Sequence, residues 1–217
     1  MLTGLRRPGT RTLNRGKFRG VFFCLMLCLE IIIQDHATLR RSVSVLDGMV
    51  KRMEEGARIE VADVTALLTF LRRFGDEYHQ RMEEQVLFPA LLTGVPVESP
   101  LRAMLSEHVE ERTLVSRIED ALRFKMGKEF VSSSHQLSLL LRNHFDKEDA
   151  VLGDVAEKCL SKEQDEAVAA ELIKHQPPAE AHPNFSRLEW KYTSKPLSTP
   201  LTPQREAARA YRSATTR

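Results

Sequence analysis

Histidine and glutamate recur four residues apart in two separate parts of the chain. His79 precedes Glu83, and His144 precedes Glu148. Residues four apart lie on the same face of an α-helix, so each pair would project an imidazole and a carboxylate side by side, about one turn apart. Imidazole nitrogens and carboxylate oxygens are common ligands of transition-metal ions. The two pairs therefore make metal binding the chemistry to test.

Two further histidines extend the pattern to every long helix that the sequence predicts. Apolar periodicity and end signals predict helices over about residues 25–54, 60–92, 100–126 and 128–159. Four of the seven histidines fall one to a helix on the apolar stripe: His36, His79, His108 and His144. We expect an all-α, up-down-up-down antiparallel four-helix bundle, because four long helices with short connections most simply fold that way. In such a bundle the histidines and glutamates can converge on one buried spot.

A purely structural role for these polar side chains is the competing interpretation. Acids make up 30 of the 217 residues, so a single histidine–glutamate pair is weak evidence. A lone core histidine is also more often hydrogen-bonded than metal-bound. Two buried carboxylates are harder to explain, because each costs free energy unless a cation compensates it. A dication would supply that charge, so metal binding is the favoured interpretation. The other histidines, His135, His175 and His182, fall off the stripe or at helix ends and are left out.

The types of ligand narrow the choice of metal. Imidazole and carboxylate without a cysteine on the stripe favour iron or manganese, whereas thiolate would favour zinc or copper. Four imidazoles and two carboxylates that can bridge offer fewer bonds than two five- or six-coordinate ions take. We therefore expect two iron ions with open positions for a small gaseous or peroxide ligand. The alternative, a mononuclear zinc or manganese site, would leave two or three ligands unused.

The remainder of the chain sets the domain organisation. We expect a flexible basic leader at 1–24, the bundle at 25–160, a short helix at 161–176 and a disordered basic tail at 177–217. The short helix opens with a capping-box pattern, SKEQ. The arginine-rich leader could instead be a targeting segment, or an extension before a true start at Met26.

Composition argues against several classes of partner. The formal net charge is only +2 and the basic residues concentrate near the two ends, so we expect no binding to nucleic acid or a membrane surface. The apolar run that precedes the first histidine is interrupted by Glu30 and is too short for a transmembrane span. The cysteines, Cys24, Cys28 and Cys159, show no paired spacing, which favours the reducing cytoplasm. Nothing in the sequence predicts the oligomeric state.

Four blocks of sequence together resemble the hemerythrin-like HHE cation-binding domain. They are LEIIIQDHATLRRSVSVLDGM, FGDEYHQRMEEQVLFPAL, LSEHVEERTLV and LRNHFDKEDAVL, in the family's order over about residues 29–157. The resemblance implies a di-iron site with six ligands: His36, His79, Glu83, His108, His144 and Glu148. It also implies that the two glutamates bridge the ions. Periodicity and ligand chemistry select the same six residues.

The chain departs from the family at two positions. Oxygen-carrying members have a histidine where Arg112 stands, so the chain resembles the broader group rather than the carriers. Many members have a second histidine directly after the first in the second block, where this chain has Gln80, so Gln80, Glu84 or water could substitute for that donor. Acidic neighbours that could orient the imidazoles from behind, or simply lie at the surface, are Glu84, Glu107 and Asp149.

Three functional classes are consistent with these residues. We favour a protein that binds or senses dioxygen or nitric oxide, or holds iron, because no output domain or second catalytic group is recognisable. The alternative is a di-iron redox enzyme that reduces nitric oxide or peroxide or repairs iron–sulfur clusters, as some relatives do. Those repair proteins add a cysteine-bearing N-terminal region, which Cys24 and Cys28 match poorly. A bundle that has lost its metal is the third class, supported only by Gln80 and Arg112.

Overall fold

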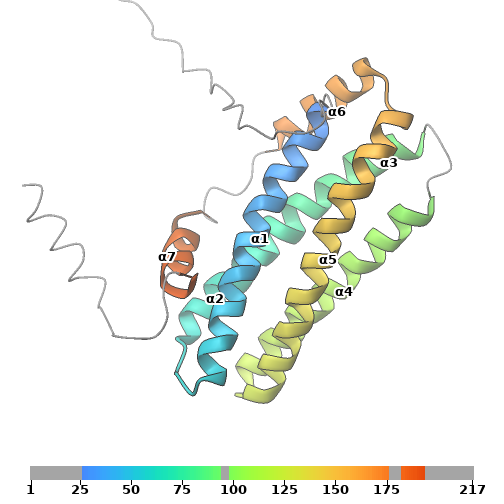
Figure 1. The fold of residues 1–217 in the computed structure, drawn as a ribbon. Coiled ribbons are helices and arrows are strands. Elements are labelled where there is room, and N and C mark those ends of the chain that lie inside the picture. The colour runs from blue at the N-terminus through green and yellow to red at the C-terminus, as the bar shows by residue number, and fades with distance from the viewer. Residues whose placement is uncertain (1–25, 94–97, 176–181, 194–217) are drawn as a thin grey trace, which may run out of the picture.

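The computed structural model describes residues 26–93, 98–175 and 182–193, and the regular structure in these ranges is entirely helical (Figure 1). The all-α prediction is confirmed. The basic leader with Cys24, the tail beyond residue 193 and the segments 94–97 and 176–181 lie outside the described residues. Among the described helices, none combines the length and the apolar character that crossing a membrane would take.

Long helical segments lie side by side and form the bundle (Figure 1). Three of them are single α-helices: α1 (Leu27–Glu54), α4 (Glu98–Arg123) and α5 (Gly127–Cys159). The other is an unbroken run of shorter elements: α2 (Val61–Phe70), η1 (Leu71–Gln80), η2 (Glu83–Leu87) and α3 (Phe88–Leu92). α5 packs against both α1 and α4. Each observed boundary lies within a few residues of the predicted one, because the apolar periodicity runs almost the full length of each segment.

Two π-helical stretches interrupt the second segment, where the sequence predicted a uniform α-helix. Elements η1 and η2 are π-helices, in which each N–H bonds the carbonyl five residues back, and π-helical turns are frequent at functional sites. η1 ends just after His79 and η2 begins at Glu83, so this pair lies at their junction. The run continues through Pro89, which is the second residue of α3.

α6 (Lys162–Lys174) follows α5 and covers the start of α1 (Figure 1). Its capping box is present: the Ser161 hydroxyl accepts the Gln164 N–H at 3.3 Å, and the Gln164 side chain accepts the Ser161 N–H at 2.8 Å. The Asp165 carboxylate accepts the backbone N–H groups of Leu27 and Cys28 at 2.9 and 3.0 Å. α6 thus caps the N-terminus of α1, whose first N–H groups have no partner within their own helix.

Residues His182–Thr193 form a further helix, α7, so the prediction of a disordered tail from residue 177 is wrong over this range. α7 packs against α1 and α2 (Figure 1). Its inward face is apolar and consists of Phe185, Leu188 and Tyr192. The helical spacing of these three residues was the signal for α7, but the surrounding Pro, Ser, Thr and Arg obscured it.

A buried carboxylate anchors α7 to the start of α2. The Asp63 side chain is 1% exposed and accepts hydrogen bonds from Arg187 and Lys191, both at 2.5 Å, and from the Tyr192 hydroxyl at 2.7 Å. Burial raises the pKa of Asp63, but these donors outweigh burial and hold the pKa below its ordinary value. The carboxylate is therefore charged and fully paired at neutral pH.

Candidate metal centre

Six polar side chains lie together inside the bundle, each at most 2% exposed. They are the six predicted ligands, contributed by α1, η1, η2, α4 and α5: His36, His79, Glu83, His108, His144 and Glu148. They form two groups of four, one with His36 and His79 and the other with His108 and His144. Both groups include Glu83 and Glu148, and within each group one donor atom per residue lies within 4.8 Å of the others.

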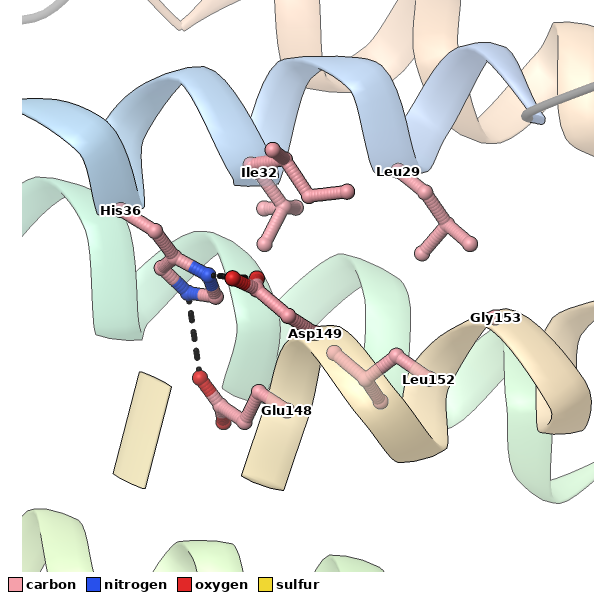
Figure 2. Close-up of a pocket in the computed structure, with 8 residues that line it drawn as sticks. Leu29, Ile32, His36, Glu148, Asp149, Leu152 and Gly153 are labelled. Atoms are coloured by element: carbon pink, nitrogen blue, oxygen red, sulfur yellow. Dashed lines mark hydrogen bonds and ion pairs between the residues drawn. The ribbon is translucent and has the colours of Figure 1, made fainter. Parts of the chain in front are cut away.

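Glu83 and Glu148 are shared by the two groups, and their carboxylates contact histidines of both. Glu83 Oε1 is 3.6 Å from His36 Nε2 and 3.5 Å from His79 Nε2, and its Oε2 is 3.4 Å from His108 Nε2. Glu148 Oε2 is 3.1 Å from His36 Nε2 and 3.3 Å from His144 Nε2. Figure 2 marks the contact between Glu148 and His36 with a dashed line. Ligands about 2.1 Å from one ion at tetrahedral or octahedral angles are about 3.0–3.4 Å apart. The observed separations are close to that spacing, so the donors fit ions of this size.

Most of the inward-facing atoms make no hydrogen bond. Both carboxylate oxygens of Glu83 and of Glu148 are buried without a hydrogen-bond partner, as are the Nε2 atoms of His36 and His79. Buried carboxylates are normally hydrogen-bonded or paired, because leaving them unsatisfied costs several kcal/mol. Four such oxygens beside imidazole nitrogens are the arrangement that dications would satisfy. The donor chemistry therefore fits two metal ions that share the carboxylates.

Carboxylates lie behind three of the four imidazoles. Each makes a short contact with the outward Nδ1 atom: Asp149 with His36 at 2.6 Å, Glu84 with His108 at 2.9 Å, and Glu107 with His144 at 2.9 Å. These are the three acidic neighbours that the sequence singled out. A carboxylate at Nδ1 fixes a proton there, so that the Nε2 lone pair is available to an ion when the imidazole is neutral.

Cations lie on the outer side of these carboxylates. Arg40 Nη2 is 2.8 Å from Asp149, Arg112 Nη2 is 2.8 Å from Glu84, and Lys147 pairs with Glu107. The pKa of each of the three carboxyls is raised by burial, but the donors around it outweigh burial and keep the pKa below its ordinary value. Arg112, which stands where oxygen carriers have a histidine, therefore acts behind His108 rather than among the six inward side chains.

His79 differs from the other three imidazoles. Its Nδ1 lies 3.6 Å from Asp35 Oδ2, beyond hydrogen-bond distance, and has no hydrogen-bond partner. Asp35 also contacts the Tyr78 hydroxyl, and burial together with the Asp35 charge raises the pKa of Tyr78 to about 12. The sequence analysis missed Asp35 even though it directly precedes His36, because the contact depends on how α1 is rotated against η1.

Gln80 and Glu111 form a buried pair beside the centre. The Gln80 amide donates to the Glu111 carboxylate, and the Gln80 Oε1 atom is buried without a hydrogen-bond partner. Burial raises the pKa of Glu111 to about 7. The sequence analysis did not select Glu111, although its position three residues after His108 predicts that the two share a helix face.

The buried carboxylates and imidazoles shift one another's pKa values. Burial raises the pKa of Glu83, but the surrounding imidazoles hold it well below its ordinary value. Burial lowers the pKa of His108, but the neighbouring carboxylates outweigh this effect and raise the pKa to about 9. The pKa of His36 is likewise raised well above its ordinary value by Asp149, Glu148 and Glu83. Protons on His36 and His108 thus balance the carboxylates, and a metal ion would compete with those protons.

A small cavity reaches one side of the centre between α1 and α5 (Figure 2). It measures about 20 Å³, which is room for one water-sized molecule. Its walls are mainly apolar and also include His36, Glu148 and Asp149. The other wall residues that Figure 2 labels are Leu29, Ile32, Leu152 and Gly153.

Two of the three histidines that were left out of the predicted site lie apart from it. The His135 side chain is 55% exposed and contacts Glu54 at 3.0 Å, as expected for the outer face of α5. His175 is also exposed, at the end of α6 beside Glu171. The side chain of His182 lies outside the described residues.

A family model for the hemerythrin HHE cation-binding domain matches residues 28–156, more than half of the 217-residue chain. The chain belongs to this family. Its fold is therefore that of a hemerythrin-like helical protein, and its class is that of a cation-binding, or metal-binding, protein. The match includes all six inward side chains and ends before α6 and α7.

Relatives in the curated proteins match a smaller part of the chain. Uncharacterized proteins of Mycobacterium bovis and Mycobacterium tuberculosis are 22% identical to it over 89 residues. The alignment covers 41% of this chain and 35% of each relative, so the chain spans about a third of the length of the curated relatives it matches. No solved structure matches the chain significantly.

Proposed function

We propose that this protein is a non-haem di-iron protein that binds or senses a small ligand such as dioxygen or nitric oxide, or that holds iron. The observation that carries the proposal is the pair of four-residue groups that share Glu83 and Glu148. Each group offers two imidazoles and two carboxylates without a thiolate, a combination that favours iron or manganese. A mononuclear zinc or manganese site would leave one group unused.

The residues would divide the work as follows. His36 and His79 would hold one ion, His108 and His144 the other, and the two glutamates would bridge them. Iron would supply open coordination positions and a change of oxidation state. Asp149, Glu84 and Glu107 would keep three of the imidazoles turned inward through Nδ1.

The cavity between α1 and α5 supports a small, uncharged ligand. It has room for about one water-sized molecule, and its apolar walls would not solvate an ion. Dioxygen and nitric oxide have suitable size and charge, and peroxide in its protonated form is also small and neutral.

Two other expectations belong to the proposal. The up-down-up-down antiparallel order of the bundle is supported by the short connections at residues 55–60 and 124–126. A cytoplasmic location is supported by Cys28 and Cys159, which are both free thiols.

A di-iron redox enzyme, acting in nitric oxide or peroxide reduction or in iron–sulfur cluster repair, is the second candidate. It is favoured by Glu111, a buried carboxyl three residues from His108 with a pKa raised to about 7 by burial. Such a group can exchange a proton near neutral pH, and reduction of peroxide or nitric oxide consumes protons.

Elemental analysis and visible spectroscopy of the purified full chain test the proposal. We expect two irons per chain and an absorption band that responds to dioxygen or nitric oxide. The double variant His79→Ala, Glu148→Ala should lose both, whereas His135→Ala, which removes an exposed histidine, should keep both. Absence of metal in the wild type, or unchanged iron in the double variant, would refute the site. Turnover of peroxide or nitric oxide would favour the enzyme over the binding protein.

A further inference from the structure

The two groups that share Glu83 and Glu148 differ in how their imidazoles are held. In the group with His108 and His144, both outward Nδ1 atoms lie 2.9 Å from a carboxylate oxygen. In the group with His36 and His79, only His36 has such a partner, at 2.6 Å. The Nδ1 of His79 makes no hydrogen bond although the residue is only 1% exposed. One group therefore has two fixed imidazoles and the other has one.

The cavity between α1 and α5 adds a second difference. It is lined by His36 and Glu148 and includes neither His108 nor His144 in its walls (Figure 2). An ion held by His36 and His79 would thus lie beside a space that can hold one water-sized molecule. His79 also lies at the end of a π-helical stretch, next to its junction with the following turn. The missing hydrogen bond at His79 and the neighbouring cavity thus set the group with His36 and His79 apart from the other group.

We propose that the two metal positions are unequal, and that the position formed by His108 and His144 fills first while the one formed by His36 and His79 exchanges more readily. This inference rests on the proposed dinuclear centre. An imidazole with a hydrogen bond at Nδ1 is already turned as the metal requires, whereas a free one must be ordered when the metal binds. Loss of one such outer partner typically lowers metal affinity about 10–100-fold.

Repulsion between two dications would make the second binding step weaker in any dinuclear site. Two steps alone therefore do not distinguish the positions. The positions are distinguished by which residues control the affinity of the first binding step. Two outer carboxylates, one behind each position, make this comparison possible. Glu107 supports His144 in one position, and Asp149 supports His36 in the other.

The experiment is a titration of the metal-free full chain with Mn²⁺, followed by electron paramagnetic resonance, which separates isolated ions from coupled pairs. In the wild type we expect isolated bound Mn²⁺ up to about one equivalent and coupled pairs thereafter. Glu107→Gln should weaken the first step about 10–100-fold, whereas Asp149→Asn should weaken the second step by a similar factor. Both changes replace a carboxylate with an amide of similar size, and circular dichroism would check that the helices remain.

The opposite assignment, with Asp149→Asn weakening the first step, would overturn the inference, as would equal weakening of the first step by both variants. Coupled pairs from the first addition onward would also contradict it. These outcomes differ from failure of the proposed function, in which the wild type would bind neither Mn²⁺ nor iron at this site. His135→Ala is the control for loss of a histidine outside the centre.

Discussion

Each imidazole of the centre has two nitrogen atoms with different surroundings. The Nε2 atoms face the shared carboxylates, and three of the four Nδ1 atoms face a carboxylate behind the ring. The inner carboxylates have no hydrogen bonds of their own, while the outer ones are paired with Arg40, Arg112 and Lys147. The carboxylates that would bind metal are therefore different residues from the carboxylates that orient the imidazole rings.

Metal affinity should rise with pH because protons and metal compete for the same nitrogens. The pKa of His108 is raised to about 9 by Glu83 and its neighbours, against burial. We therefore expect the apparent affinity for Fe²⁺, measured anaerobically, to increase between about pH 6.5 and 9, with proton release detectable by calorimetry in buffers of different ionisation enthalpy. Affinity that is constant over this range would contradict the assignment of His108.

The raised pKa of His108 should make the metal-free protein less stable as the pH rises. A raised imidazole pKa stabilises the fold fully below the unfolded value of about 6.5, and this contribution is lost as the pH rises through about 9. The melting temperature of the metal-free protein should thus include a contribution that declines between about pH 6.5 and 9. The metal-loaded protein should lack this decline, because bound metal would keep His108 unprotonated throughout.

Glu111 gives a separate prediction about pH. Burial raises its pKa from 4.5 to about 7, so between these values the unfolded chain ionises while the folded protein keeps the carboxyl neutral. Stability from this residue therefore falls as the pH rises from about 4.5 to 7. Glu111→Gln should be more stable than wild type at pH 8 and similar at pH 4, measured by thermal unfolding. If the variant were less stable than wild type at pH 8, neighbouring groups would have to compensate the charge of ionised Glu111.

At the scale of elements, the sequence predicted the long helices well and their distortions poorly. Apolar periodicity and end signals located each long segment and the capping box of α6. The π-helical stretches left no signal, because side-chain spacing along one helix does not reveal which carbonyl each N–H bonds. α7 was missed because a disorder-prone composition hid its three apolar residues. Asp35 was missed because contacts between helices depend on helix rotation, whereas the spacing of Glu111 from His108 on one helix was a signal that the analysis overlooked.

Gly48 on α1 allows a close approach by α7. A Cβ added there would lie 2.2 Å from the backbone oxygen of Tyr192, which cannot move without displacing α7. We expect Gly48→Ala to lower the free energy of unfolding by roughly 1–3 kcal/mol, as overpacking does, in urea denaturation of the full chain. Gly153→Ala is the control, because a Cβ there meets nothing within 4 Å. Equal stability of the two variants would show that α7 is not held against α1.

At the scale of the whole molecule, two helices beyond the family match hold the bundle at different places. The matched region is residues 28–156, whereas α6 caps the start of α1 and α7 binds Asp63 at the start of α2. Neither helix contributes to the six buried side chains of the centre. The family domain thus supplies the proposed metal chemistry, and the added helices stabilise the segments that carry His36 and His79.

The central claim is that two metal ions share the carboxylates of Glu83 and Glu148. The most direct test is the iron content per chain after anaerobic loading and removal of free metal. We predict two irons in the wild type and in Glu110→Gln, which changes an exposed glutamate on α4. Glu83→Gln should lose affinity for both irons, because both proposed positions use this carboxylate. One iron or none in the wild type, or two irons retained at full affinity in Glu83→Gln, would contradict the account.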